Sequence, residues 1–499
     1  MSIRVYNTMS RTKEEFRPRE PGKVAMYVCG PTVYNHIHVG NARTFLSFDV
    51  IRRYLMWRGY EVTFVQNITD VDDKIITRAN EEGRSAAEVA QEYTAAFRSA
   101  MDALGVLPPT SQPLATQTIP DMIAMVERLI ERGHAYVVGG DVYFSVRSFP
   151  GYGALSGRDI DELEAGARVD VDERKEDPLD FALWKAAKPG EPHWPSPWGE
   201  GRPGWHLECS VMSERELGVP FDIHGGGSDL VFPHHENERA QSEAATGRQF
   251  VRYWMHGGML QIDSEKMSKS LGNFLLLKDV LARYPAPVIR MLMLQTHYRS
   301  PLDFSDSRLD EAAAALERIS NVVRNLEWTV QSGTTGHGAS VEDRAALDAA
   351  VRQARERFVE AMDDDFNTAG AIAALFELGR VCNAYLAEHL AELGSDDRSV
   401  LRSAAQAIRE LLGVLGIRLE AEQKEEEPTS EVVAMARDLA GYGGEDAEEA
   451  LRALVAAREA ARAERNWSAA DAVRDALGVL GYVIEDTPSG PRVVFRGKE

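Results

Sequence analysis

The order of apolar and polar positions predicts a strand, a helix and a second strand near the start of the chain. Residues 23–29 (KVAMYVC) form an apolar run typical of a buried strand, and residues 42–58 have the periodicity of an amphipathic helix that ends at Gly59. A second apolar run, residues 61–67 (EVTFVQN), follows at once. This order is one half of a doubly wound parallel sheet that binds nucleotides, so we expect an α/β fold.

The second half of this sheet is expected after an insertion. Loops rich in Pro, Trp and Gly interrupt the pattern before residue 200. The elements predicted from here are a helix at 119–133, a hairpin at 135–146, strands at 220–224 and 250–255, and one continuous helix over 228–245 between those strands. The two halves together predict a Rossmann-like catalytic sheet with an inserted segment.

Helical spacing of apolar positions dominates the rest of the chain. Residues 279–294, 308–327 and 343–386 predict a helical bundle, and the acidic stretch 420–430 indicates a solvated linker before a compact tail. The predicted division is a first half of the catalytic domain at 1–114, an insertion at 115–200, the second half at 201–305, an α-helical bundle at 306–419 and a small C-terminal domain at 431–499.

Composition restricts the kinds of partner and the compartment. The net charge of −22 argues against a general binder of polyanions, so a nucleic acid would have to be held by local basic patches and base contacts. Three cysteines are too few for a disulfide framework, which fits a reducing cytoplasm. We see no leader-like start and no uncharged run long enough to cross a membrane, and we expect a soluble, untargeted protein.

A candidate phosphate site lies where the first strand leads into its helix. His38-Val39-Gly40-Asn41 falls at this junction, where free backbone amides and the helix dipole can receive phosphate. His38 and Asn41 would add side-chain donors, and Gly40 would allow close approach of an adenine or ribose. A histidine before a helix is equally often a cap or a packing residue.

The pentapeptide Lys266-Met267-Ser268-Lys269-Ser270 is the second candidate phosphate-binding element. Lys266 and Lys269 lie in a glycine-bounded stretch, where two ammonium groups can stabilise charge on a polyphosphate. The alternative is an ordinary solvated basic loop. The presence of the His38–Asn41 motif favours the chemistry of adenylate formation.

Four residues form a candidate metal site. His234 and Glu238 are spaced i, i+4 and share one helix face, while His235 is expected to point elsewhere. Cys209 and Cys29 can complete the set, because Cys29 ends the first strand and parallel strand ends meet in one crevice. Two thiolates, an imidazole and a carboxylate suit zinc. Buried cysteines and a surface His/Glu pair without a metal remain the alternative.

Several motifs carry a resemblance to a known family. They are Met26 to Tyr34 (MYVCGPTVY), Asn67 to Lys74 (NITDVDDK), Pro203 to Ser210 (PGWHLECS), Asp222 to Gly227 (DIHGGG), Phe232 to Glu238 (FPHHENE) and Lys266 to Gly272 (KMSKSLG). With these motifs the chain resembles cysteinyl-tRNA synthetase, a class I aminoacyl-tRNA synthetase, nearly from end to end. The resemblance implies ATP-dependent activation of L-cysteine, with ATP bound as its Mg²⁺ complex, and transfer of cysteine to tRNA(Cys).

The resemblance also implies roles for individual residues. One zinc ion per chain, held by Cys29, Cys209, His234 and Glu238, would take the substrate thiolate as a further ligand. The residues implied around the amino-acid pocket are Thr69, Trp205, His224 and Asp229, and those implied at the anticodon are Trp467, Asp471, Arg474 and Asp486. Core packing is an equal alternative for Thr69, and a solvated ion pair is the alternative for Asp471 and Arg474. The family's motif that corresponds to His38–Asn41 usually ends in histidine, where this chain has Asn41. The resemblance also implies a monomer.

Zinc would explain the choice of cysteine over serine. An apolar pocket separates such near-isosteres by only about 10²-fold, whereas a soft metal ionises a thiol far more readily than an alcohol. Two rival functions remain open from the sequence. One is a ligase of mycothiol synthesis that makes the same adenylate but lacks a long tail, and the other is a silent paralogue that binds RNA or zinc.

Overall fold

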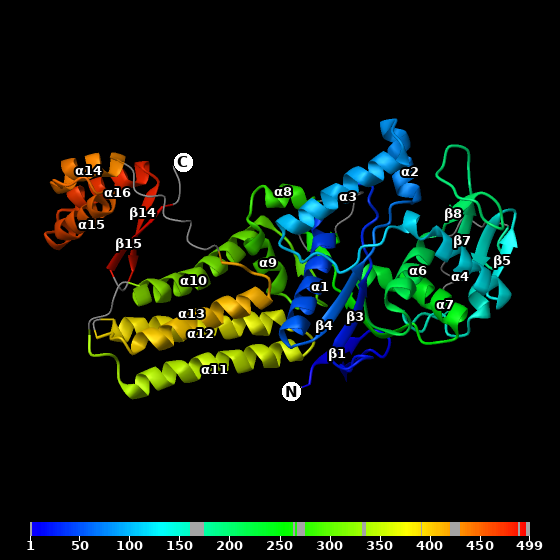
Figure 1. The fold of residues 1–499 in the computed structure, drawn as a ribbon, viewed down its shortest axis with the longest axis horizontal. Coiled ribbons are helices and arrows are strands. Elements are labelled where there is room, and N and C mark those ends of the chain that lie inside the picture. The colour runs from blue at the N-terminus through cyan, green and yellow to red at the C-terminus, as the bar shows by residue number, and fades with distance from the viewer. Residues whose placement is uncertain are drawn as a thin grey trace. The chain divides into compact units, whose positions relative to one another are not determined.

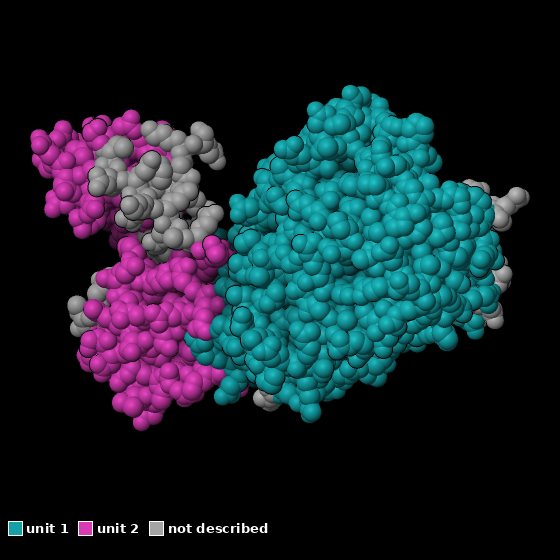
Figure 2. Space-filling model, turned by 45° about the vertical axis from the view of Figure 1, so that its right-hand side comes forward, with its two compact units in different colours: residues 1–317, 355–374, 411–417 teal, residues 318–354, 375–410, 418–499 magenta. Residues whose placement is uncertain are grey.

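The computed structural model describes residues 2–159, 174–262, 265–266, 275–331, 336–390, 392–419, 430–487 and 490–495. The chain divides into two compact units, which Figure 2 shows in different colours. Unit 1 comprises residues 1–317, 355–374 and 411–417, and unit 2 comprises residues 318–354, 375–410 and 418–499.

The centre of unit 1 is a four-stranded, fully parallel sheet in the order β10-β9-β3-β4. Its strands are β3 (Lys23–Val28), β4 (Glu61–Gln66), β9 (Phe221–Gly227) and β10 (Val251–Gly257). Met26 in β3 lies opposite Phe64 in β4 on one side and Ile223 in β9 on the other. The chain order reverses between β3 and β9, so the predicted doubly wound, Rossmann-like sheet is confirmed.

Helices and an inserted sheet surround these strands. Between β3 and β9 lie α1 (Val39–Trp57), α2 (Asp73–Glu82), α3 (Ala86–Ala103), α4 (Ile119–Glu131) and α6 (Trp205–Leu217). The insertion contributes a separate antiparallel sheet in the order β5-β6-β7-β8, and Figure 1 shows it beside α4 and α6. Its strands are β5 (Ala135–Val138), β6 (Asp141–Phe144), β7 (Phe181–Ala186) and β8 (Gly201–Pro203). The predicted hairpin at 135–146 is therefore present.

The continuous helix predicted over 228–245 is wrong. A 3₁₀ turn at Ser228–Leu230 and a π turn at Val231–His235 precede α7 (Glu236–Thr246). Phe232 is extended inside this segment, with φ −140° and ψ 131°. The physical reason is Pro233, because the residue before a proline is disfavoured in helical conformation.

A short three-stranded sheet follows β10. It contains β11 (Leu260–Ile262), β12 (Glu265–Lys266) and β13 (Leu302–Asp303), in the order β12-β11-β13. Two helices, α8 (Leu277–Leu281) and α9 (Ala286–Leu294), lie between β12 and β13 in the chain. Near the N-terminus, β1 (Arg4–Asn7) and β2 (Thr12–Glu15) form an antiparallel pair.

The remainder is mainly helical, as predicted. The long helices are α10 (Asp306–Gln331), α11 (Val341–Asp363), α12 (Thr368–His389) and α13 (Asp397–Val414). The tail contains α14 (Ser430–Ala440), α15 (Ala447–Ala463), α16 (Trp467–Val479), β14 (Tyr482–Thr487) and β15 (Gly490–Phe495). One run predicted over 343–386 is two helices, because Asp365 and Phe366 have positive φ values that break it. The acidic linker lies almost wholly outside the described residues.

One apolar core of unit 1 packs side chains of α4, α6 and the inserted sheet against residues of the central strands, and it contains both Cys29 and Cys209. The tail has a smaller core of its own, built from side chains such as Val432, Leu454 and Leu477. Among the helices that the structure describes, none is long and apolar enough to cross a membrane.

Candidate active site and metal centre

A pocket of about 340 Å³ lies outside the carboxyl ends of the central strands. Its wall comes from the segment after β3, from the start of α1, and from residues after β9 and β10. The sequence-predicted residues that line it are Cys29, His38, Gly40, Asn41, Trp205 and Asp229. Its position at the reversal of strand order is where doubly wound sheets bind ligands.

His38 and Asn41 cap the start of α1 with reciprocal hydrogen bonds. The Asn41 backbone amide donates to His38 Nδ1 at 3.2 Å, and the His38 backbone amide donates to Asn41 Oδ1 at 3.4 Å. Because Nδ1 accepts, a neutral His38 carries its proton on Nε2. The cap does not use His38 Nε2 or Asn41 Nδ2, and both residues line the pocket.

The four predicted metal ligands converge around Cys29, which is one of the lining residues of this pocket. One donor atom from each of Cys29, Cys209, His234 and Glu238 lies within 4.8 Å of the others, and all four residues are buried. Cys29 Sγ lies 3.6 Å from Cys209 Sγ and 3.5 Å from Glu238 Oε1, while His234 Nε2 lies 2.9 Å from Glu238 Oε1. A Cys₂HisGlu cluster of this kind can hold a metal ion.

The pKa shifts in the cluster differ from one ligand to the next. Burial raises the pKa of Cys209, but hydrogen bonds from Cys29 and His234 outweigh it and lower the pKa to about 6. Burial and the neighbouring Cys209 sulfur raise the pKa of Cys29. Burial lowers the pKa of His234, but the Glu238 charge outweighs it and raises the pKa to about 10. These shifts favour a Cys209 thiolate beside a protonated His234 and a neutral Cys29 thiol, so a bound metal ion would have to displace the protons of Cys29 and His234.

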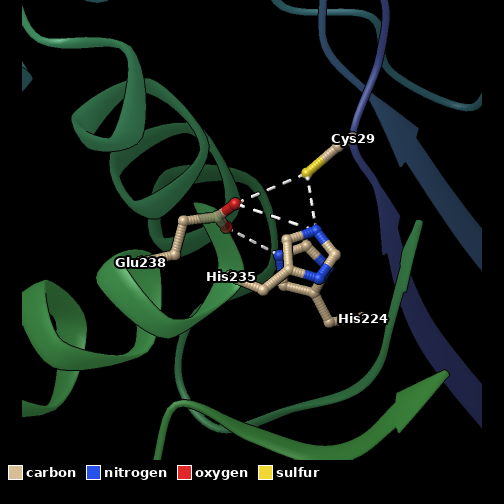
Figure 3. Close-up of side chains that lie close together, drawn as sticks. All are labelled: Cys29, His224, His235 and Glu238. Carbon is tan, nitrogen blue, oxygen red and sulfur yellow. Dashed lines mark hydrogen bonds and ion pairs between the residues drawn. The ribbon is translucent and has the colours of Figure 1, made fainter. Parts of the chain in front are cut away.

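His235 does not point away from the cluster, contrary to the prediction. Its Nε2 lies 3.3 Å from Cys29 Sγ, and its Nδ1 lies 2.8 Å from His256 Nε2. Figure 3 shows a second group of possible ligands, formed by Cys29, His224, His235 and Glu238. Both groups share Cys29 and Glu238, so they are two faces of one buried cluster.

Local backbone features bring these side chains together. The turn at Val231–His235 positions His234 and His235 immediately before α7, which carries Glu238. Gly226 at the end of β9 is required for close approach, because a Cβ there would lie 2.7 Å from the His235 ring. His206 Nδ1 lies 2.8 Å from His234 Nδ1 and can fix the His234 ring with Nε2 facing Glu238.

The four residues implied for the amino-acid pocket fall in two groups. Trp205 lines the pocket and stacks on His234 with ring centroids 4.0 Å apart, and the exposed Asp229 also lines the pocket. His224 is fully buried, with Nε2 at 2.7 Å from Glu238 Oε2. Thr69 is buried and donates to Glu208 Oε2 at 2.7 Å. His224 and Thr69 are not among the lining residues.

Lys74 is a lining residue that we did not predict. Its ammonium lies 5.6 Å from the centre of the Tyr34 ring and 5.9 Å from that of Trp205. The distances are those of cation–π contacts and place a positive charge at the pocket. The sequence contained a signal, because Lys74 ends the NITDVDDK motif.

The lysines of the pentapeptide are only partly described. The Lys266 backbone belongs to β12 and pairs with Gln261 of β11, but its side chain lies outside the description. Lys269 lies outside the described residues altogether.

In the tail, Trp467 begins α16 and is 59% exposed. Arg474 forms ion pairs with Asp471 at 2.8 Å and with Asp475 at 2.9 Å, on the exposed side of the same helix. Asp486 lies in β14 opposite Pro491, and its side chain is not described.

Solved structures with a similar fold define the class. The Mycobacterium tuberculosis methionyl-tRNA synthetase in complex with methionyl-adenylate matches with a TM-score of 0.58 at 16% identity, over 79% of this chain and 90% of that one. A leucyl enzyme of Agrobacterium radiobacter K84 (LeuRS), in a ternary complex with tRNA, matches with a TM-score of 0.57 at 13% identity, over 81% and 87%. The fold is that of a class I aminoacyl-tRNA synthetase.

Three known family models match the chain. They are the "tRNA synthetases class I (C) catalytic domain" at residues 15–314, the "DALR domain" at 357–420 and the "Cysteinyl-tRNA ligase anticodon binding domain" at 445–493. The cysteine–tRNA ligases of Pelotomaculum thermopropionicum and Geobacter metallireducens are 51% and 52% identical, each over 98% of this chain and 99% of the relative. The chain belongs to the cysteine–tRNA ligase family.

Proposed function

We propose that this chain activates L-cysteine with ATP and transfers the cysteinyl group to the 3′ end of tRNA(Cys). The observation that carries the proposal is that Cys29 of the buried Cys₂HisGlu cluster lines the same pocket as His38 and Asn41. A thiol-selecting metal for cysteine and a phosphate-binding helix start for ATP would then face the same pocket. Membership of the cysteine–tRNA ligase family supports the choice of cysteine and tRNA.

We propose zinc as the metal, bound by Cys29, Cys209, His234 and Glu238. The donor set fits, because two thiolates and an imidazole favour a soft, tetrahedral ion. When bound, zinc supplies a soft Lewis acid that ionises a thiol near neutral pH and binds an alcohol poorly. Trp205, stacked on His234, would close the amino-acid side of the pocket together with Asp229.

The chain's own residues would stabilise the phosphates during adenylate formation. The cysteine carboxylate attacks the α-phosphate of ATP-Mg, and pyrophosphate leaves. The Nε2–H of His38, the Nδ2–H of Asn41 and the start of α1 offer donors on one side. Lys266 and Lys269 are expected on the other, and Lys74 adds a further positive charge at the pocket.

We propose that the tail reads the anticodon. The exposed indole of Trp467 is suited to stack on an unpaired base. The other proposed base contacts are Asp471, Arg474 and Asp486. Asp471 and Arg474 form an ion pair with each other, which would have to break before either side chain contacts the RNA. A monomeric, cytoplasmic protein is proposed from the family resemblance alone.

Cysteine-dependent exchange of pyrophosphate into ATP, followed by charging of tRNA(Cys), tests the proposal. We expect exchange with cysteine but not with serine, and charging with the same preparation. Exchange without charging would point to an adenylate-forming ligase with another acceptor, and absence of exchange would point to a silent paralogue. Removal of the metal should abolish cysteine-dependent exchange, whereas exchange that survives complete removal would contradict the role of zinc.

A further inference from the structure

Arg43 is a buried cation whose hydrogen bonds go to backbone carbonyls. It lies in α1 two residues after Asn41, and its side chain is only 2% exposed. No ion pair with a carboxylate is found for it among the residues that the structure describes. A buried charge is costly unless hydrogen bonds satisfy it, so the partners of this guanidinium are informative.

The carbonyl partners of Arg43 come from two chain segments, one just before β11 and the other just before β13. Nη1 donates to Gly258 O at 3.0 Å and to Met259 O at 2.9 Å, immediately before β11. Nη2 donates to His297 O at 3.4 Å and to Ser300 O, shortly before β13. One planar guanidinium therefore ties both segments to α1.

These segments determine where the Lys266 backbone lies. Strand β11 pairs with β13 on one side and with β12 on the other, and Gln261 of β11 lies opposite Lys266 of β12. Met259 O also accepts from the backbone amide of Leu302 in β13, at 3.1 Å. A shift at Met259 would therefore move both pairings of β11, including the one that holds Lys266.

Close packing at Gly258 indicates that the position has little freedom. The Gly258 amide donates to Tyr298 O at 2.7 Å. A Cβ at Gly258 would lie 2.5 Å from the carbonyl oxygens of Arg299 and Ser300. The segment before β11 is thus held by Arg43 from one side and by residues 298–300 from the other.

We propose that Arg43 is a positioning residue for adenylate formation, because it fixes the strand pair that carries Lys266 against the helix that carries His38 and Asn41. The inference rests on the proposed function, in which these residues act on the phosphates from opposite sides. Arg43 itself does not line the pocket. Its effect on the reaction passes through geometry, where an error of about 1 Å can cost about 10²-fold in rate.

A double-mutant cycle between Arg43→Lys and Lys266→Ala tests this role. Lysine keeps the charge but cannot bridge four carbonyls. We expect Arg43→Lys to lower kcat of cysteine-dependent exchange about 10²-fold in the wild-type background and less than about tenfold when Lys266 is alanine. KM for cysteine and the bound metal, measured by elemental analysis, should not change.

Arg290→Lys is the matched control. Arg290 is also a buried arginine that donates to backbone carbonyls, those of Leu104 and Leu415, and it pairs with Asp49 at 2.6 Å. Its substitution should lower thermal stability and should change kcat by the same factor, within about twofold, in both backgrounds.

Equal losses from Arg43→Lys in both backgrounds, or loss of bound metal, would overturn the role of Arg43. An inactive wild type would overturn the proposed function itself. Gly258→Ala is a second variant for the case that Arg43→Lys does not fold, because its Cβ displaces the same segment while Arg43 remains. Because Gly258 itself lines the pocket, the same double-mutant cycle is the readout: its loss of kcat should shrink when Lys266 is alanine, and an equal loss in both backgrounds or a normal kcat would overturn the inference.

Discussion

At the scale of single residues, Asn41 combines a capping function with the phosphate-binding function proposed above, and different atoms of its side chain serve the two functions. Its Oδ1 accepts the His38 amide and completes the cap of α1, while its Nδ2 remains a donor at the pocket. His38 divides its ring in the same way, with Nδ1 in the cap. The alternative that His38 is only a cap and the proposal that it binds phosphate are therefore compatible.

Asn41→Asp separates these two functions. The carboxylate keeps an acceptor for the His38 amide and is favourable at a helix N-terminus by about 0.3–1 kcal/mol. It removes the Nδ2 donor and places a negative charge where phosphate is expected. We predict unchanged or slightly higher stability in urea unfolding, and a loss of about 10²-fold or more in kcat/KM for ATP in the exchange assay.

Asn41→Ala is the control for Asn41→Asp, because it removes both the Oδ1 acceptor of the cap and the Nδ2 donor, while the Asn41 backbone amide can still donate to His38 Nδ1. It should lower the free energy of unfolding by about 0.5–1 kcal/mol, the usual contribution of one hydrogen bond, as well as the activity. If Asn41→Asp loses as much stability as Asn41→Ala, the cap rather than the donor explains its loss of activity.

The position of a site residue could be predicted from the sequence where it follows directly from the end of one strand or from the spacing along one helix. Convergence of Cys29 with His234 and Glu238 followed from the strand end and the i, i+4 spacing. The position of His235 could not, because it depends on a turn whose geometry Gly226 and Pro233 set together. Nothing local marked Arg43, since its partners lie more than 200 residues away in the chain.

At the scale of elements, the break before α7 and the start of α13 show how single polar or proline residues set helix ends. Pro233 interrupts the predicted helix, and its effect on Phe232 could have been anticipated from the sequence. At α13, the buried Asp397 accepts hydrogen bonds from the amides of Gly394 at 2.8 Å and Ala339 at 3.2 Å. It also accepts from the Tyr385 hydroxyl.

Asp397→Asn should lower stability in a pH-dependent way. Burial raises the pKa of Asp397, but the hydrogen bonds from Gly394 and Tyr385 outweigh it and hold the pKa below its usual value. A depressed folded pKa stabilises the protein above the unfolded pKa of about 4, and this stability is lost as the pH falls through the folded pKa. We predict a loss of about 2 kcal/mol at pH 7 that narrows as the pH falls below about 4.

Urea unfolding at several pH values measures this difference. Asp396→Asn is the control, because the Asp396 side chain is 75% exposed and lies 3.7 Å from Arg344. It should change stability by less than about 0.5 kcal/mol at every pH. A constant difference between wild type and Asp397→Asn across the acid range would contradict the titration of Asp397.

At the scale of the whole molecule, the catalytic sheet and the tail have separate cores. Unit 1 ends with residues 411–417, before the acidic stretch, and the core of the tail contains residues from α14, α15 and α16 together with β14. The existence of these parts could be predicted from changes in periodicity and charge. The boundaries of the five predicted domains stay predictions. The two compact units divide the chain elsewhere, within α10 between Glu317 and Arg318.

Because the last segment of unit 1 ends at Ile417, a chain that stops at Leu419 keeps every residue of the pocket and the metal cluster. We predict that it retains its metal and cysteine-dependent exchange within about threefold, while charging of tRNA falls by 10²-fold or more. The loss of charging follows from losing base stacking, at about 1–3 kcal/mol per base, together with the other contacts of the tail.

Full-length Trp467→Ala is the matched variant, because the exposed indole contributes little to folding. It should raise KM for tRNA about tenfold and leave exchange unchanged. If the shortened chain charges tRNA normally, the tail does not read the anticodon. If it loses exchange as well, the two parts depend on each other for folding, and Trp467→Ala alone then decides whether the tail binds tRNA.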